Sequence, residues 1–143
     1  MSSSKNIALF AVAREREVGV DIERINPTIA GESIPELFFS VRETSTLRAL
    51  PEEIQARAFF DCWSRKEAYI KALGTGLSLA LNSFDVSLEP DKPAALLCTR
   101  NDSDKVNHWF MQSLDAGPAY SAALVVEDEG KDGELKLQFW EWH

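Results

Sequence analysis

A long segment without helix-breaking residues occupies the middle of the sequence. No proline or glycine interrupts residues 52–73, and Pro51 and Gly74 flank them. A proline before the first turn, the acidic Glu52 and Glu53 within it, and a glycine after the last turn are typical of the two ends of a helix. We therefore expect one long helix here, around which the rest of the chain is arranged.

The second half of this helix carries three side chains that could do chemistry. Trp63, Glu67 and Lys71 recur every four residues, so an indole, a carboxylate and an ammonium would project from one face. Such a face could hold a metal and a phosphate side by side. The alternative is an amphipathic core helix with an ordinary Glu-Lys pair, worth about 0.2–0.5 kcal/mol. Taken alone, the segment favours this alternative.

The composition is that of an ordinary globular domain. A chain of 143 residues, 45% of them apolar, can bury one sizeable core without a metal or a disulfide. The formal net charge of −8 argues against nucleic-acid binding, which requires basic patches. Within this acidic chain, Arg65, Lys66 and Lys71 form the densest basic cluster. The charge alone is equally compatible with a local role for this cluster and with a solvated strip.

The two cysteines and the N-terminal residues bear on the compartment. Cys62 and Cys98 match no metal-binding or redox spacing and are expected to be reduced thiols. No apolar run approaches the roughly 20 residues that cross a bilayer, and the first residues lack the apolar core of a signal sequence. The sequence thus predicts a cytoplasmic protein.

Two short apolar segments precede the helices. Residues 7–13 and 18–23 both predict strands, and the connection 14–17 is short enough for an antiparallel hairpin. In this interpretation the chain enters its first strand at Ile7 with no element before it. Turn residues then mark a loop at 26–33.

The remaining segments define the fold class. Ser40 and Glu43 fit a capping box, which predicts a helix from about 41 to 49. After the long helix, five segments separated by turn residues predict strands. They are 84–88, 94–99, 108–114, 120–127 and 135–142. The expected class is α+β, a single domain over residues 1–143 with helices packed on one face of a mainly antiparallel sheet.

Two acidic residues alternate with aliphatic ones in the segment 18–23. Asp21 and Glu23 stand two positions apart, so both side chains would emerge on one face of the strand while Val20 and Ile22 face the core. Two carboxylates on the same side of an apolar strand repel each other unless a cation lies between them. The alternative is an edge strand with a polar outer face. The spacing alone does not separate these two interpretations.

The long helix offers what such a pair of carboxylates would need. Mg²⁺ prefers carboxylate ligands and completes its shell with water and phosphate oxygens. Glu67 supplies a third carboxylate, and Lys71 lies one turn further on as a counter-charge for phosphate. Together with Asp21 and Glu23, these residues suggest a site for a metal and a diphosphate.

Several of these segments resemble the 4′-phosphopantetheinyl transferases in order and spacing. The matching segments are 18–23 (VGVDIE), 39–40 with Glu43, 58–59, 63–69 (WSRKEAY), 71–77 (KALGTGL) and 84–86 (FDV). The resemblance runs from about Ile7 to Leu88. It is closer to the two-lobed Sfp type than to the small trimeric holo-acyl-carrier-protein synthases. It implies a single lobe of that fold.

The resemblance also implies a reaction. The family transfers the 4′-phosphopantetheine arm of coenzyme A to a serine of an apo acyl, peptidyl or aryl carrier protein and leaves 3′,5′-ADP. By the matching positions, Asp21, Glu23 and Glu67 would bind Mg²⁺ against the diphosphate of coenzyme A. The three carboxylates would therefore be the metal ligands.

The remaining roles follow from the same resemblance. Glu67 would also take the proton of the carrier serine, directly or through water. Lys71 would stabilise charge on the diphosphate, and Lys66 and Ser64 would help to hold coenzyme A. Metal and cations would thus stabilise and position more than they react.

The segment 26–39 corresponds to the region where the family docks its carrier protein. Leu37 and Phe38 are apolar candidates for that contact. Burial beneath the following helix is the alternative for both side chains, and it is the one we expect.

The Sfp type carries a preceding lobe that supplies much of the adenine and 3′-phosphate pocket, and we expect this chain to lack it. A lobe that normally covers one face with its partner would expose an apolar patch as a monomer, so we expect a homo-oligomer, most simply a dimer. A second interpretation of the chain is a non-catalytic remnant that keeps the fold and carrier binding. A third is an unrelated metal-binding protein whose carboxylates coincide by chance.

Overall fold

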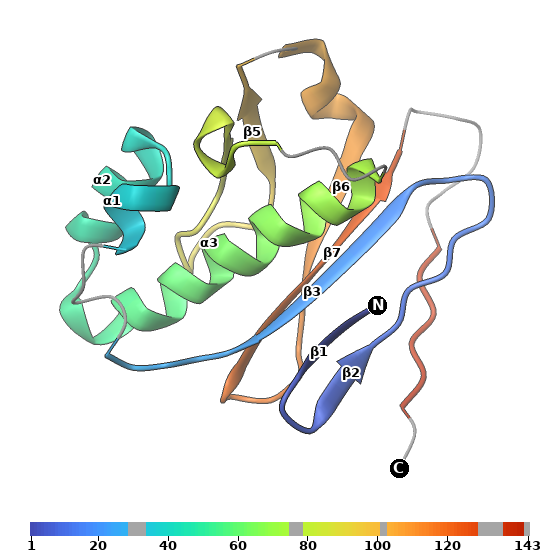
Figure 1. The fold of residues 1–143 in the computed structure, drawn as a ribbon, viewed down its shortest axis with the longest axis horizontal. Coiled ribbons are helices and arrows are strands. Elements are labelled where there is room, and N and C mark those ends of the chain that lie inside the picture. The colour runs from blue at the N-terminus through green and yellow to red at the C-terminus, as the bar shows by residue number, and fades with distance from the viewer. Residues whose placement is uncertain (29–33, 75–78, 101–102, 129–135, 142–143) are drawn as a thin grey trace.

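The computed structural model describes residues 1–28, 34–74, 79–100, 103–128 and 136–141. The helix α3 (Glu52–Leu73) lies across the strands β3 (Val18–Arg24) and β7 (Tyr120–Glu127), as Figure 1 shows. The shorter helices α1 (Ile34–Phe38) and α2 (Val41–Ala49) lie beside the N-terminal half of α3. All strand pairs are antiparallel, which confirms the α+β class.

The two predicted helices form where their end signals place them. Helix α2 has Ser40 as its N-cap, and the Ser40 hydroxyl and the Glu43 carboxylate each accept the other residue's backbone N–H. Helix α3 ends before Gly74, whose φ of 67° lies in the left-handed region that favours glycine. The capping box and the terminal glycine therefore fix the helix bounds locally.

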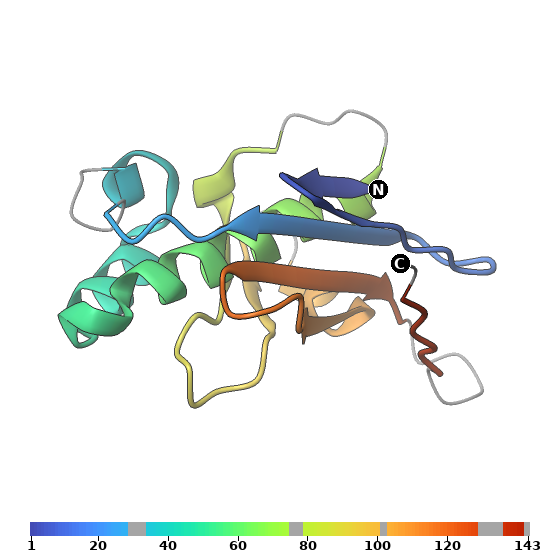
Figure 2. The same cartoon turned by 90° about the horizontal axis from the view of Figure 1, so that it is seen from below.

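A three-stranded sheet in the order β3, β7, β6 (Trp109–Leu114) supports the long helix. Asp21 pairs with Ala123 in this sheet, and directly paired residues point to the same face. Ala123 belongs to the main core beneath α3, so Asp21 also faces α3. Figure 2 shows the same layers from below.

This register reverses the expected orientation of β3. Val20 and Ile22 are buried as predicted, but they lie on the sheet face opposite α3. On that face Val20 packs with Leu124, Val126 and the partly buried Leu137 in a second, smaller cluster. Both faces of β3 are thus covered, and the interpretation of a polar outer face for Asp21, which is 3% exposed, is wrong.

The N-terminal residues form a strand that the sequence did not predict. β1 (Ser2–Ser4) pairs with β2 (Ile7–Leu9) in a hairpin whose turn includes Lys5 at a φ of 49°. The predicted hairpin of 7–13 with 18–23 is therefore wrong, as is the expectation that no element precedes Ile7. The hairpin runs beside the free edge of β3 (Figure 1). Its serine hydroxyls, rather than a continuous strand ladder, bond to that edge.

The second half of the chain agrees with most of the predicted strands. β4 (Phe84–Val86) and β5 (Leu96–Thr99) form a hairpin, and β6 and β7 lie where expected. Short 3-10 turns occupy Leu81–Ser83 and Ser103–His108. Residues 136–141 of the last predicted strand are not a strand, and Phe139 and Trp140 are exposed there. An alternating pattern is not sufficient without a neighbouring edge to pair with.

Two further expectations concern single features. Cys62 and Cys98 are both free thiols, as predicted. Burial raises the pKa of Cys62 well above its ordinary value, so this thiol is structural rather than reactive. Within the described residues, no helix is both long and apolar enough to span a membrane.

Candidate active site

The site lies where β3 crosses α3 at close range. A Cβ atom at Gly19 would stand 2.1 Å from the carbonyl oxygen of Ala68 and 2.4 Å from the backbone nitrogen of Ala72. Only glycine allows the two backbones to approach this closely. Asp21 follows two positions later on the same face of the strand. The contact at Gly19 therefore brings Asp21 next to the helix.

Asp21 is the centre of the polar contacts. Its Oδ1 atom accepts from the Lys71 ammonium at 2.9 Å and from the Ser2 hydroxyl at 3.2 Å. Its Oδ2 atom is buried and has no hydrogen-bond donor among the described residues. A buried carboxylate oxygen without a partner is costly unless a ligand supplies one. This oxygen is therefore available to bind a ligand.

Glu23 and Glu67 complete a group of like charges around Asp21. Burial, with the neighbouring Asp21 carboxylate as the next cause, raises the pKa of Glu23 to about 7. Burial and Asp21 also raise the pKa of Glu67, while Lys71 lowers it. The three carboxylates are close enough to oppose one another's ionisation.

The donor chemistry of this group fits a hard divalent cation, but no cage is preformed. Among the residues that the structure describes, no three acidic, His or Cys side chains converge as a metal site on their own. Mg²⁺ does not need such a cage, because it usually takes one or two carboxylates and fills its shell with water and phosphate oxygens. The uncommitted Oδ2 of Asp21 beside Glu23 meets that lesser requirement.

Lys66 lies in a different environment from the one that the resemblance implies. Its side chain is 0% exposed, and its ammonium forms an ion pair with Glu43 at 2.9 Å. It also donates to the carbonyl oxygen of Phe84 and lies over the ring of that residue. The ammonium is fully engaged inside the core, so this arrangement does not support a contact with coenzyme A.

The other basic and hydroxyl candidates on α3 are also structural. Ser64 is buried, and its hydroxyl lies 3.0 Å from that of Ser121 on β7. Arg65 is buried and donates to the carbonyl oxygen of Ser87 and to the hydroxyl of Ser113. The predicted basic cluster is therefore divided, and only Lys71 reaches the carboxylates.

The side chains of Trp63 and Lys71, predicted to share one helix face with Glu67, lie in different surroundings. Trp63 packs against the rings of Phe38 and Phe59 at the edge of the main core. Lys71 forms its ion pair with Asp21 across the strand, so the interpretation as an ordinary Glu-Lys pair along the helix does not describe it.

The expected burial of the two apolar candidates for carrier contact is wrong for both Leu37 and Phe38. Leu37 is 72% exposed, and Phe38 is 43% exposed although its ring meets Trp63 edge to face. Val41 is exposed nearby at the first turn of α2. The end of α1 therefore presents apolar side chains to the surroundings.

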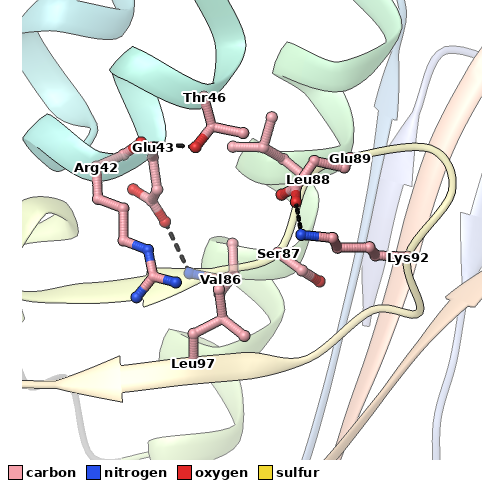
Figure 3. Close-up of a pocket in the computed structure, with 9 residues that line it drawn as sticks. All are labelled: Arg42, Glu43, Thr46, Val86, Ser87, Leu88, Glu89, Lys92 and Leu97. Atoms are coloured by element: carbon pink, nitrogen blue, oxygen red, sulfur yellow. Dashed lines mark hydrogen bonds and ion pairs between the residues drawn. The ribbon is translucent and has the colours of Figure 1, made fainter. Parts of the chain in front are cut away.

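A separate pocket of about 230 Å³ lies between α2 and the β4–β5 hairpin (Figure 3). Arg42 and the ion pair of Glu89 with Lys92 lie at this pocket, and Val86 and Leu97 provide apolar walls. It contains none of the residues predicted for the site. The candidate active site is therefore not this pocket but the polar group between β3 and α3.

The sequence model of the 4′-phosphopantetheinyl transferase superfamily matches residues 17–125, which is most of the chain. The chain belongs to this superfamily. The matched range contains β3, α3 and all four site residues Asp21, Glu23, Glu67 and Lys71.

Curated relatives within the superfamily agree with this assignment. The chain is 43% identical over 142 residues to the 4′-phosphopantetheinyl transferase HetI of Nostoc sp., covering 99% of this chain and 52% of that protein. It is 34% identical over 109 residues to the 4′-phosphopantetheinyl transferase Sfp of Bacillus subtilis, covering 76% and 46%. The chain thus spans about half the length of the curated relatives it matches.

Solved structures of holo-[acyl-carrier-protein] synthases share the fold. The holo-[acyl-carrier-protein] synthase of Thermotoga maritima matches with a TM-score of 0.60 and 23% identity, over 78% of this chain and 62% of that one. A synthase from Chronobacterium ammoniagenes, solved as a complex with coenzyme A, matches with a TM-score of 0.57 and 18% identity, over 81% and 99%. These likenesses concern the fold alone.

Two residues at this candidate site were not predicted from the sequence. The role of Gly19 has a signal, since a glycine inside a strand pattern often marks a close backbone approach. Ser2 has none, because its contact with Asp21 depends on a hairpin that local patterns did not reveal. The burial of Lys66 also has a signal, because it continues the apolar positions Phe59 and Cys62 along one helical face.

Proposed function

We propose that this chain is a Mg²⁺-dependent 4′-phosphopantetheinyl transferase domain. It would transfer the 4′-phosphopantetheine group of coenzyme A to a serine of an apo carrier protein. The observation that carries the proposal is the buried, unpartnered Oδ2 of Asp21, next to two further carboxylates and one ammonium, in a chain of this superfamily. Such an arrangement is suited to a cation and a diphosphate.

The three carboxylates have a shared task in this proposal. Asp21, Glu23 and Glu67 would hold Mg²⁺ together with oxygens of the diphosphate. A bound Mg²⁺ supplies charge stabilisation for the phosphoryl oxygens and fixes the diphosphate in place. The raised pKa values of Glu23 and Glu67 support this role, because burial and the neighbouring carboxylates disfavour the ionised forms that a cation would stabilise.

Lys71 would neutralise the leaving group. Its side chain is 38% exposed on α3, so it can reach a ligand outside the core as well as Asp21. In the transfer, the serine oxygen of the carrier bonds to the phosphorus that bears pantetheine, and the bond from this phosphorus to the bridging oxygen breaks. The electron pair of the broken bond stays on the bridging oxygen, which leaves as part of 3′,5′-ADP. Lys71 would stabilise the negative charge that develops on this oxygen.

Glu67 would receive the proton of the carrier serine, directly or through water. Burial and Asp21 raise the pKa of this carboxyl group, which makes its carboxylate a stronger base. Its place on α3, one turn before Lys71, puts acceptor and counter-charge on the same face of one rigid element. The proton and the leaving group would thus be handled from the same helix.

The exposed apolar end of α1 supports a contact with the carrier protein. Leu37, Phe38 and Val41 are large apolar side chains that remain accessible, and exposed apolar groups of this kind are typical of interaction surfaces. We assign this region to carrier docking within the proposed function.

The outer face of the sheet supports self-association. Phe10, Val12, Phe139 and Trp140 are all more than 60% exposed and flank segments that pack onto this face. We propose a homodimer through this surface. Sedimentation at micromolar concentration should give a dimer, and a strictly monomeric species would contradict the proposal.

Mass measurement tests the transfer directly. Incubation with coenzyme A, Mg²⁺ and an apo carrier should add the mass of phosphopantetheine to the carrier. Glu67→Gln should lower the rate by about 100-fold or more, the range for loss of a general base. Glu53→Gln, an exposed change in the first turn of the same helix, is the matched control and should leave the rate unchanged.

The outcomes separate the two main interpretations. No mass gain across several acyl and peptidyl carriers would favour a non-catalytic domain that keeps the fold. Undiminished transfer by the folded Glu67→Gln variant would remove Glu67 from the mechanism without affecting the assignment of the activity.

A further inference from the structure

Two serines of β1 bond to the free edge of β3 in the same way, but only one of them touches the site. The Ser2 hydroxyl oxygen accepts the backbone N–H of Ile22 at 3.1 Å, and the Ser4 hydroxyl oxygen accepts the N–H of Arg24, also at 3.1 Å. Ser2 additionally donates its proton to Oδ1 of Asp21. Ser2 is buried, whereas the bond of Ser4 is exposed.

The double contact of Ser2 restricts where its proton can go. A hydroxyl has one donor hydrogen and two lone pairs. One lone pair of the Ser2 hydroxyl accepts the N–H of Ile22. The hydroxyl proton is donated to the carboxylate of Asp21, the residue before Ile22. The hydroxyl therefore links the backbone just after Asp21 to one chosen oxygen of its side chain.

Two donors from different elements converge on that oxygen. Ser2 approaches Oδ1 from β1, and Lys71 approaches the same atom from α3. Oδ2 receives no donor from the described residues. A carboxylate held by one oxygen in this way cannot exchange its two oxygens without breaking both contacts.

We propose that Ser2 is a positioning residue, which orients the Asp21 carboxylate so that Oδ2 stays uncommitted and faces the ligand site. The inference rests on the proposed function, because it assigns the ligand of Oδ2 as the divalent metal. Outer hydrogen bonds of this kind orient metal ligands, and their loss typically weakens metal affinity by about 10- to 100-fold.

A metal titration without turnover tests the inference. Mn²⁺ is the probe, since it prefers the same oxygen ligands as Mg²⁺ and its free concentration can be read by electron paramagnetic resonance. The protein is titrated first alone and then with coenzyme A present, in both cases without carrier protein. Ser2→Ala should weaken Mn²⁺ binding by about 10-fold or more.

Ser4→Ala is the matched control. It removes the same group from the same strand and the same kind of bond to the β3 backbone, but it leaves Asp21 untouched. Its Mn²⁺ affinity should stay within about two-fold of the wild type, since it makes no bond to a proposed ligand. Ser2→Thr keeps the hydroxyl and should recover most of the affinity that Ser2→Ala loses. Urea unfolding of all variants shows whether each remains folded.

A second measurement distinguishes orientation from general damage. In the transfer assay, Ser2→Ala should raise the Mg²⁺ concentration needed for half-maximal rate, and excess Mg²⁺ should restore most of kcat. A purely structural loss would lower kcat without this recovery.

The outcomes also separate this inference from the proposed function. Equal Mn²⁺ affinities for folded Ser2→Ala and Ser4→Ala, with transfer intact in the wild type, would overturn the role of Ser2 alone. An absence of Mn²⁺ binding by the wild type in both titrations would overturn the metal site together with this inference.

Discussion

Two lysine-carboxylate pairs involve the same helix and have the same length, but their surroundings differ. The Lys66 ammonium lies 2.9 Å from Glu43, and the Lys71 ammonium lies 2.9 Å from Asp21. Both oxygens of Glu43 are used, since Oε1 also accepts from the backbone of Ser40 and Oε2 from that of Val86. One oxygen of Asp21 is unused.

The difference indicates which pair holds the fold and which is open to a ligand. Lys66 and Glu43 are at most 1% exposed and connect α2, α3 and β4. Lys71 is 38% exposed and holds only one side of its partner. The distance between the charges does not separate the two roles. The number of carboxylate oxygens already satisfied by the protein does.

The largest expected effect is on the buried pair. Lys66→Met leaves the Glu43 charge buried without its counter-ion, which should lower the free energy of unfolding by about 3–5 kcal/mol. Urea unfolding measures this loss. The double change of Lys66→Met with Glu43→Gln should regain part of it, because the uncompensated charge is gone. A loss below about 1 kcal/mol for the single change would show that the comparison between the two pairs is wrong.

The half-buried pair of Lys71 with Asp21 should affect the transfer rate more than the stability. Lys71→Met should lower the free energy of unfolding by less than Lys66→Met does, because the Lys71 side chain is 38% exposed whereas Lys66 is fully buried. The transfer rate should fall by about 100-fold or more, because a cation at the developing diphosphate charge is lost. Rate and unfolding are measured on the same preparation. A destabilisation as large as that of Lys66→Met, with transfer retained, would make both pairs structural.

The smallest expected effect is a pH dependence confined to the open site. The pKa of Glu23 is raised from 4.5 to about 7, so the folded metal-free chain binds this proton more tightly than the unfolded chain. The resulting stability is present in full below about pH 4.5 and is lost as the pH rises through about 7. Because Glu23 is only half-buried, we expect the change to be about 1 kcal/mol.

Unfolding in urea between pH 4.5 and 8, without divalent metal, measures this dependence. Other groups contribute to the curve, so the difference between the wild type and Glu23→Gln isolates the contribution of Glu23. Saturating Mg²⁺ should reduce the difference, since a cation favours the ionised carboxylate. Parallel curves for the two proteins would contradict the assigned pKa.

Local signals were sufficient to predict α2, α3 and most strands, but they did not predict the short helix α1. The capping box of Ser40 with Glu43 and the glycine after Leu73 depend only on neighbouring residues, and the structure has both helices at the predicted bounds. The segments 18–23 and 63–71 resemble the 4′-phosphopantetheinyl transferases. The family model that matches residues 17–125 confirms this assignment.

The misplaced features depend on contacts between distant segments. The alternation in β3 predicted two faces but not which face meets the helix, because Val20 and Asp21 are both buried. The serine hydroxyls that bond to this strand give no periodic signal. Lys66 was grouped with Lys71 by charge, whereas the position of each on α3 decides which one enters the core.

The contact at Gly19 has a consequence for how the site tolerates change. Strand and helix meet there through backbone atoms of Ala68 and Ala72, with no intervening side chain that could adopt another rotamer. The separation between Asp21 and the helix is therefore set by main-chain geometry. Substitutions in the surrounding apolar core can leave this separation unchanged. Drift at apolar positions is compatible with constant spacing of the charged groups, whereas a single methyl group at position 19 is not.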